Sequence, residues 1–468
     1  MCSIFSILNN DNPFSKEFIK SQFEKGKVVG SGNSQLSHNI QSTFGFHRIP
    51  NNCSKVPIIM NGDIFLICNG EIYNYKELYQ LMNVTPTTQS DCEVIIHLYK
   101  LYGIEETLNM LDGVFAFILF DYRISNKDLT CKCYIGRDPF GIRPLYIMKS
   151  TDPENNLIAF ASEYKVLNEH YQIVVNDHTL QLFHPGTYSY YSLSNKVLSK
   201  WIPEKENIVY FIPSFPKTLI NNSVTNEFMY KVMDSIRVNL KNAVYKRCRS
   251  TEKPIAVFLS GGLSSSLIAA LVSQYYVETF GFNKLETYSI FREDLKYAKI
   301  VADYIGSSHT EIGVTEKEMC EAIPKDVKNT ISVKGNYLVE KYIAQHSSAK
   351  VIFNEYGSDD VCGGNCPDPI GFDKETRRLL KDIHLFHNRC NSFYGLEVCM
   401  PFLDIEFVNN YISIPAFVRS NEFFKDKGIN IIEKYLLRAS FSSLAGRILE
   451  KQILPDEILW ETQEKEKL

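Results

Sequence analysis

Residues 255–277, IAVFLSGGLSSSLIAALVSQYYV, decide the fold of the second half of the chain. An apolar run leads into Gly261-Gly262 and then into a longer apolar stretch, which is the pattern of a buried strand, a tight turn and a helix. A long helix is predicted before this stretch at 226–248, and strands at 286–291, 310–314 and 349–354 follow it, with a helix at 297–306 among them. Strands that alternate with helices indicate a parallel α/β sheet.

The first half has a different sequence pattern, in which turn residues separate short strand-like runs. These runs are CSIFSIL (2–8), PIIM (57–60), DIFLIC (63–68), GVFAFILFDY (113–122), CKCYIG (131–136), PLYIM (144–148) and LIAFAS (157–162). Helical stretches at 75–82 and 91–111 interrupt them. Clustered strands with a few helices predict stacked sheets with helical outer layers. Prolines at 203, 213 and 216 mark residues 201–224 as a linker between domains at 1–200 and 225–468.

Length and charge limit the classes of function. A chain of 468 residues is long enough for two domains. A net charge of -4 gives no general field for nucleic acid or acidic lipid. No apolar run approaches the ~18 residues of a membrane helix, and the first residues lack the basic flank of a secretory signal. We therefore expect a cytoplasmic protein with no nucleic-acid or membrane partner.

The cysteines are expected to be reduced thiols, because disulfides are rare in the cytosol. Two spacings, Cys131-x-Cys133 and Cys362-x3-Cys366, resemble half of a zinc site. Neither has a second ligand pair at a suitable distance, so zinc is not expected.

Cys2 stands apart because it follows the initiator methionine. Removal of Met1 would place a free α-amino group, with an ordinary pKa of about 8, beside the thiol of the same residue. One residue would then supply both a base and a nucleophile. A second-position cysteine alone is a weak signal, and its neighbours decide what it means.

An acyl-transfer site also needs hydrogen-bond donors directed at a tetrahedral oxyanion. Asn69-Gly70 follows an apolar strand and offers a side-chain amide and an unhindered backbone N–H. The alternative is a type I′ hairpin turn, which Asn-Gly favours and which Asn61-Gly62 exemplifies.

A site for a zwitterionic amino acid needs a guanidinium for the carboxylate and a carboxylate for the ammonium group. Arg48 and Asp91 are the candidates in the first half. The alternative is that both are ordinary surface charges.

Several motifs of the first half occur together and in order. They are CSIF (from Cys2), NGEIYNYKEL (from Asn69), SDCEVI (from Ser90), LDGVFAFILFD (from Leu111), IGRDPFGIRPLY (from Ile135), FASEYKVL (from Phe160) and PGTY (from Pro185). This half resembles the class II glutamine amidotransferases, and the whole chain resembles the glutamine-hydrolysing asparagine synthetases. The resemblance implies that Cys2 is the nucleophile, Asn69 and Gly70 form the oxyanion hole, Arg48 holds the glutamine carboxylate, and Glu71 and Asp91 hold its amino group.

The second half carries the remaining motifs. The loop SGGLSSS (260–266) resembles the pyrophosphate loop of ATP-pyrophosphatases, although a glycine pair is also common in tight turns. GSDDVCGG (357–364) and GLEVCMPFLD (395–404) are similar to later synthetase motifs. The resemblance implies glutamine, aspartate and ATP as substrates, and ATP and Mg²⁺ as cofactors. It assigns nucleotide binding to Leu259, Ser260, Gly261, Gly262, Ser264, Ser265, Ile290, Tyr356 and Gly357, and metal binding to Asp359.

Departures from the family pattern gather in this second half. Ser264 stands where the family loop has a magnesium-binding aspartate, and Tyr356 stands where it has a glutamate, with Glu355 at a family glycine. Cys399 replaces an arginine, and Gln463 aligns with a lysine. In the first half, GSGN (30–33) lies where the family has an Arg-Gly-Pro-Asp loop. Together these changes predict a weakened synthetase site and an intact glutaminase nucleophile.

The sequence thus predicts an α+β glutaminase domain of the N-terminal nucleophile type, with four αββα layers, followed by an α/β domain similar to the adenine nucleotide α-hydrolases. The leading function is glutamine-dependent synthesis of asparagine. Two alternatives stay open, a protein that only hydrolyses glutamine and a catalytically silent sensor or partner of an active homologue. A homodimer is also left open.

Overall fold

The computed structural model describes residues 2–11, 13–27, 32–39, 41–48, 58–60, 62–123, 130–152, 156–194, 200–216, 224–291, 296–315, 317–318, 331–363, 369–387, 394–420, 433–442 and 453–460. The chain forms two compact units, Met1–Ile212 and Pro213–Leu468. None of the helices within these ranges has the length and apolar character needed to cross a bilayer.

The first unit is built on two antiparallel sheets. One has the strand order β10 (His178–Leu182), β8 (Tyr146–Ser150), β9 (Ile158–Ala161), β1 (Cys2–Leu8), β3 (Ser42–Arg48) and β2 (Asn33–Asn39). The other has the order β12 (Trp201–Val209), β11 (Thr187–Ser194), β7 (Thr130–Arg137), β6 (Gly113–Asp121), β5 (Ile64–Ile72) and β4 (Ile58–Met60). The candidate residues Cys2, Arg48 and Asn69 lie on β1, β3 and β5, and β3 and β5 are each next to an edge strand.

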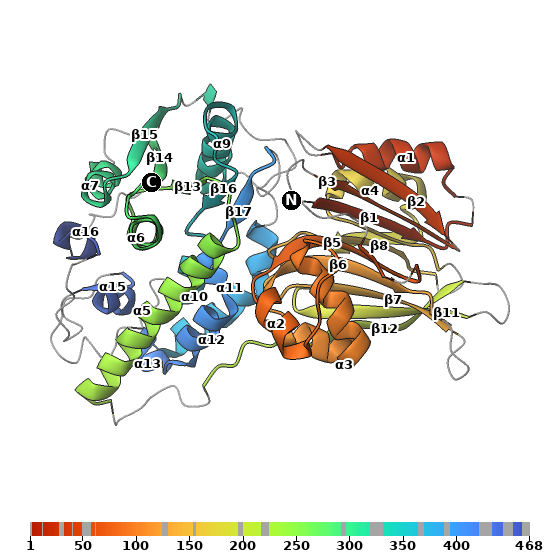
Figure 1. The fold of residues 1–468 in the computed structure, drawn as a ribbon, viewed down its shortest axis with the longest axis horizontal. Helices are drawn as coiled ribbons and strands as arrows, with labels where there is room; N and C mark the ends of the chain where they lie inside the picture. The colour runs from red at the N-terminus through yellow and green to blue at the C-terminus, as the bar shows by residue number, and fades with distance from the viewer. Residues whose placement is uncertain are drawn as a thin grey trace. The chain divides into compact units, whose positions relative to one another are not determined.

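Helices cover the outer face of each sheet (Figure 1). On the first sheet α1 (Lys16–Glu24) and α4 (Tyr164–Val174) share a core with β1, whereas α2 (Tyr75–Met82) and α3 (Val94–Met110) share one with β5 and β6. A third core, which includes Phe46 and Ile67, joins the inner faces of the two sheets. These three cores separate four layers, so the predicted αββα arrangement is confirmed.

The predicted linker is wrong at its start, because residues 201–209 form β12. Trp201 is fully buried and packs edge-on against Phe120, with ring centroids 5.8 Å apart. Its backbone N–H and carbonyl are both bound by the side chain of Asn9, at 2.8 and 2.7 Å. Pro203 fits in this strand because β12 is the edge of its sheet, where a missing N–H leaves no ladder bond unmade.

The second unit contains a parallel five-stranded sheet, as the alternating pattern predicts. Its order is β15 (Ser308–Gly313), β14 (Glu286–Phe291), β13 (Ile255–Phe258), β16 (Val351–Phe353) and β17 (Glu397–Cys399). From β13 the chain proceeds outward to β14 and β15, and then returns to β16 on the other side of β13. The switch point between β13 and β16 is where open parallel sheets form their ligand crevice.

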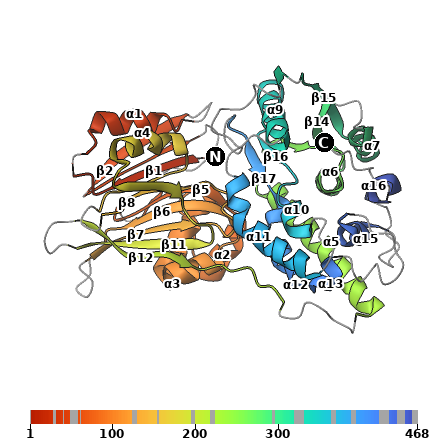
Figure 2. The same ribbon diagram turned by 180° about the vertical axis from the view of Figure 1, so that it is seen from behind.

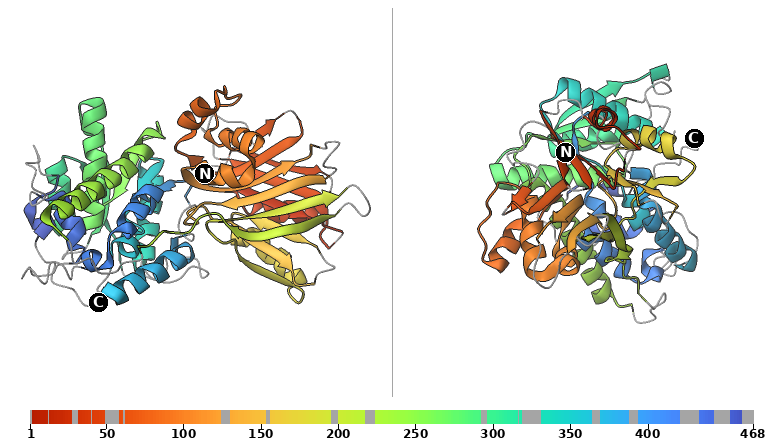
Figure 3. Two further views of the ribbon diagram at one scale, coloured as in Figure 1. Left: turned by 90° about the horizontal axis from the view of Figure 1, so that it is seen from below. Right: turned by 90° about the vertical axis from the view of Figure 1, so that its right-hand side faces the viewer.

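Right-handed crossovers place the connecting helices on both faces of this sheet. α6 (Leu263–Phe280) and α7 (Lys296–Ile305) lie on one side, and α9 (Ile331–His346) packs on the other through Val339 and Ile343 (Figures 1 and 2). The long helix α5 (Asn226–Arg249) runs beside later helices (Figure 3). It contacts η2 (Pro401–Leu403), α12 (Ile405–Ser413) and α15 (Tyr435–Phe441). This part of the unit also contains α10 (Ser358–Cys362), α11 (Pro369–His387), α13 (Ala416–Arg419) and α16 (Asp456–Trp460).

Candidate functional site

Cys2 begins β1, and its backbone lies opposite Arg48, the last residue of β3. The side chain of Cys2 lies outside the described part of the structure. Arg48 is half-buried, and its carbonyl accepts the N–H of Gly32 at 2.8 Å, so the end of the GSGN segment is bound to the same strand end. Residues 30 and 31 of that segment lie outside the description. The antiparallel register thus brings the backbone of Cys2, the predicted nucleophile, beside that of Arg48, which is predicted to bind the glutamine carboxylate.

Asn69 and Gly70 do not form a hairpin turn. Both lie inside β5 and pair with Ala116 and Phe115 of β6, so the turn alternative is wrong at this position. A side chain at residue 70 would place Cβ 2.5 Å from the carbonyl oxygen of Val114, which is why glycine is required there. The other Asn-Gly does lie between two paired strands, β4 and β5, although Asn61 itself is outside the described residues.

Strand alternation places the glutamine-site candidates on the facing sides of the two sheets. Side chains two residues apart share a face. Asn69 and Glu71 therefore share a face with Ile67, and Arg48 shares one with Phe46, and both of these apolar residues belong to the core between the sheets. Asn69 is only 3 % exposed, and its Oδ1 has no hydrogen-bond partner among the described residues. This oxygen can accept a hydrogen bond from a ligand, whereas the predicted oxyanion role would use the N–H groups of the same amide.

Asp91, the second predicted ligand of the amino group, is held against β5. Its Oδ2 accepts the N–H of Ile72 at 2.6 Å, at the strand end that carries Glu71. The loop before it is shaped by Glu93, whose carboxylate accepts the N–H groups of Thr87 and Thr88. Burial alone would raise the pKa of Glu93, but these hydrogen bonds outweigh burial and hold the pKa below its usual range. The structure thus brings Asn69, Gly70, Glu71 and Asp91 to one end of β5.

We expect Asn69→Ala to lower glutamine turnover about a hundredfold while the melting temperature stays nearly constant, because a donor directed at developing charge acts in the transition state. The matched control is Asn74→Ala. The Asn74 side chain donates to the carbonyl of Met110 at 2.9 Å and accepts the N–H of Asp112 at 3.1 Å. This control should lose stability and keep its rate. Steady-state glutamate release and thermal unfolding decide the matter, and equal kinetic losses in both variants would contradict the oxyanion role.

In the second unit, the loop between β13 and α6 sits at the switch point of the sheet. The N–H of Leu259 is bound to the carbonyl of Tyr288 at 2.8 Å, which fixes the start of the loop on β14. Gly261 has φ +85°, and a Cβ there would lie 2.8 Å from the backbone nitrogen of Ala298. Gly262 caps the N-terminus of α6. At position 261, glycine is therefore needed both for the backbone conformation and for the close approach of α7.

The carboxylate of a residue distant in sequence is hydrogen-bonded to this loop. Glu355, just after β16, accepts the backbone N–H of Ser265 at 2.8 Å and the hydroxyl of Ser260 at 3.1 Å. The two serine hydroxyls are 2.8 Å apart. Loss of hydration raises the pKa of Glu355, although Lys434 and the Ser260 hydroxyl oppose the shift. The sequence singled out the two serines, but it marked Glu355 only as a departure from the family glycine.

Lys434 is the functional candidate that sequence reasoning missed. Its Nζ donates to the hydroxyls of Ser264 at 2.9 Å and Ser358 at 3.1 Å, and forms an ion pair with Asp359 at 2.5 Å. Its side chain is only 11 % exposed. Burial alone would lower the pKa of Lys434, but Asp359 and Glu355 outweigh it and hold the pKa above its ordinary value. No local motif marks this lysine, which lies 170 residues after Ser264.

The described residues form no cage of carboxylates that could hold magnesium by protein ligands alone. Within the described ranges, no group of three or more histidine, cysteine, aspartate or glutamate side chains could hold a metal. Asp359 is paired with Lys434, and Glu355 is bound to the loop. Any magnesium here would depend mainly on the phosphate oxygens of a nucleotide, which is how this ion is commonly held. The metal role of Asp359 stays a prediction.

The other predicted nucleotide residues lie along the same edge. Ile290 is in β14, and its Cδ1 lies 3.0 Å from where a Cβ of Gly335 in α9 would be. Tyr356 follows β16, and its hydroxyl accepts a hydrogen bond from the amide of Asn336 in α9. Gly357 has φ +86° and precedes α10. The structure therefore gathers the whole predicted set at the carboxyl edge of β13, β14 and β16.

Glu340, one turn of α9 beyond Asn336, is a buried carboxyl that is 4 % exposed. Burial raises its pKa from 4.5 to about 8. Because the folded value lies above the unfolded one, the stabilising effect of the neutral form is complete below about pH 4.5 and is lost as the pH rises towards 8. Glu340→Gln should match the wild type at pH 4 and be more stable by about 3 kcal/mol at pH 7.

Chemical unfolding at several pH values tests this expectation. The control is Glu375→Gln on α11, whose carboxylate is paired with Arg378, which lowers its pKa. That substitution should give no gain at neutral pH. A Glu340→Gln variant without added stability at pH 7 would show that the native structure accommodates the charged form.

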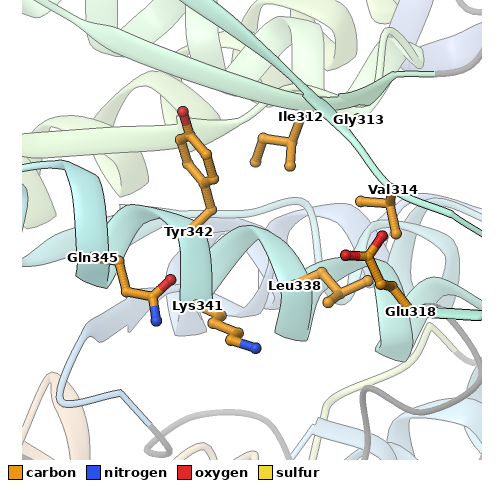
Figure 4. A pocket seen from close by; sticks show the side chains of 8 residues that line it. All are labelled: Ile312, Gly313, Val314, Glu318, Leu338, Lys341, Tyr342 and Gln345. Carbon is orange, nitrogen blue, oxygen red and sulfur yellow. The ribbon is translucent and has the colours of Figure 1, made fainter.

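A separate hollow of about 440 Å³ lies between the end of β15 and α9 (Figure 4). Its lining residues are Ile312, Gly313, Val314, Glu318, Leu338, Lys341, Tyr342 and Gln345. It shares no residue with the predicted nucleotide site.

Comparisons with known proteins agree with this division of the chain. Residues 1–200 match the family described as glutamine amidotransferase domain, and residues 235–367 and 372–467 match asparagine synthase. The glutamine-hydrolysing asparagine synthetases of mouse and human are each 32% identical to this chain. Each alignment covers 99% of this chain and 83% of the relative. The chain belongs to the glutamine-hydrolysing asparagine synthetase family. The chicken asparagine synthetase is also 32% identical over the same shares.

Membership of the asparagine synthetase family confirms the resemblance seen in the sequence, along with the two-domain fold. The roles of individual residues are not decided by it, because identity near 32% leaves room for the substitutions at Ser264, Tyr356 and Cys399. In the structure Cys399 ends β17, and its side chain is buried. Gln463 lies outside the described residues. Family membership therefore establishes the architecture, whereas the activity of the second domain has to be judged from the contacts within its site.

Proposed function

We propose that this chain is a glutamine-dependent asparagine synthetase, in which Cys2 hydrolyses glutamine and the second domain uses the ammonia to amidate activated aspartate. The observation that best supports this proposal is the pairing of β1 with β3, which puts Cys2 opposite Arg48, together with the buried amide of Asn69 on the facing sheet. In this proposal Cys2 is the nucleophile, Arg48 binds the carboxylate of glutamine, and Asn69 donates to the oxyanion. The second domain then needs only to bind a nucleotide and an acceptor.

At the glutaminase site, the α-amino group of processed Cys2 takes the thiol proton, and the thiolate attacks the amide carbon of glutamine. Asn69 and the N–H of Gly70 stabilise the oxyanion, and Arg48 holds the substrate carboxylate. Glu71 and Asp91 receive the substrate ammonium group. Collapse of the intermediate releases ammonia and leaves a thioester, which water hydrolyses to glutamate.

At the synthetase site, the β-carboxylate of aspartate attacks the α-phosphorus of ATP and pyrophosphate leaves. Ammonia then attacks the acyl carbon, and AMP departs as asparagine forms. Backbone N–H groups at the start of α6 would hold phosphate oxygens, and Lys434 would supply positive charge nearby. When bound with the nucleotide, magnesium would neutralise charge on the phosphates.

The test is incubation of the intact protein with glutamine, aspartate and ATP-Mg, followed by assay of asparagine, AMP and glutamate. Production of all three supports the proposal. A parallel reaction with ammonium chloride in place of glutamine isolates the second domain. Glutamate without AMP or asparagine would instead support the second candidate, a protein that only hydrolyses glutamine.

A further inference from the structure

The backbone N–H groups at the start of α6 are the donors that the proposed function assigns to a phosphate chain. Helix N-termini attract anions because several N–H groups lack partners within the helix and the helix dipole is positive there. In this chain one of these donors, the N–H of Ser265, is already bound by Glu355. The donor is therefore satisfied by the protein itself before any ligand arrives.

The contact is made at both oxygens of the carboxylate. One oxygen accepts the Ser265 N–H at 2.8 Å, and the other accepts the Ser260 hydroxyl at 3.1 Å. The hydroxyl of Ser265 is bound in turn to the carbonyl of Gly262 at 3.1 Å and lies 2.8 Å from that of Ser260. A carboxylate with this pattern has the charge and the acceptor geometry of a bound phosphate edge.

Lys434 attracts the carboxylate of Glu355, but the hydrogen bonds and the ion pair of its Nζ go to other side chains. Lys434 is engaged by Asp359, Ser264 and Ser358. Asp359 is 76 % exposed on the solvent side of that pair. A phosphate chain that enters the loop would therefore meet a carboxylate at the donors it needs, and its repulsion from Glu355 is strong in a partly desolvated site.

We propose that Glu355 is a specificity-determining residue whose carboxylate occupies a phosphate position of the loop, so that a phosphate chain binds only by displacing it. The inference rests on the proposed function, because it concerns the loop that would hold ATP. Burial also raises the pKa of Glu355, which makes its charge less costly to remove than that of an exposed glutamate. The residue thus weakens binding of free pyrophosphate to this loop.

Inorganic pyrophosphate is the probe, titrated calorimetrically into the intact chain with and without Mg²⁺. Glu355→Gln removes the charge and keeps the shape, whereas Glu355→Ala also empties the position. We expect affinity for pyrophosphate to rise about tenfold or more in the glutamine variant, and further in the alanine variant. The control is Glu278→Gln at the opposite end of α6, where the carboxylate contacts Lys241 and Tyr245. It removes the same charge and should leave pyrophosphate affinity unchanged.

Three results would overturn the inference. Equal affinity in the wild type and both variants would make Glu355 a simple helix cap, which should show instead as a lower melting temperature. Binding that requires Mg²⁺ in the wild type and is lost in both variants would make Glu355 a cation ligand. Absence of pyrophosphate binding in the wild type and in every variant would show that this loop does not bind phosphate groups. Glutamate release, assayed on the same preparations, separates each of these from failure of the glutaminase proposal.

Discussion

Cys2→Ala will abolish the release of glutamate from glutamine, with a loss of at least about a thousandfold, because it removes the thiol that would form the thioester. The thiol and the α-amino base belong to the same residue, so the substitution removes the nucleophile and leaves the base in place. Arg48, opposite residue 2 in the sheet, is untouched, and glutamine should still bind. The measurement is glutamate release at saturating glutamine, with binding followed separately by calorimetry.

Processing of the terminus is part of this expectation. Mass spectrometry of the protein from its native source should show Met1 absent, because the base exists only on a free Cys2 amine. Cys68→Ala is the matched control, since Cys68 is a buried free thiol of β5 in the same unit. It should keep its rate at some cost in stability. Wild-type turnover by Cys2→Ala would end the glutaminase proposal.

Aspartate-dependent exchange of labelled pyrophosphate into ATP will be about a thousandfold slower in this protein than in a relative that carries the loop aspartate. Departure of pyrophosphate concentrates negative charge, and catalysis depends mainly on its stabilisation by metal and cations. Losing a metal-binding carboxylate at Ser264 costs several kcal/mol, or about this factor in rate. Ser264 instead accepts a hydrogen bond from Lys434 at 2.9 Å.

The restoring variant is Ser264→Asp combined with Tyr356→Glu. We expect it to recover part of the exchange. The recovery is only partial because an aspartate at 264 would lie beside Lys434, which would pair with it. Glutaminase activity, measured on the same preparation, should be unchanged. Robust exchange in the unmodified protein would show that other residues supply the missing charge, and Asp359 and Asp360 would be examined first.

The amino-acid sequence by itself determined the elements that depend on local pattern. The strand, glycine turn and helix over 255–277 are observed as β13, the loop and α6, and the predicted helix at 75–82 coincides with α2. Apolar periodicity and turn residues act between near neighbours, which is why they can be recognised in a single sequence. The order of motifs was enough to identify the family and to single out Cys2, Arg48 and Asn69.

Tertiary structure decided the features that depend on partners far along the chain. Asn69-Gly70 looks like a turn until β6 pairs with it, and residues 201–209 look like a linker until Trp201 enters the core between the sheets. Glu355 meets the N–H of Ser265 across 90 residues. Burial and charge pairing depend on which segments the topology brings together, and local sequence carries no record of that. The composition of the phosphate loop was therefore readable in advance, whereas its internal carboxylate and lysine were not.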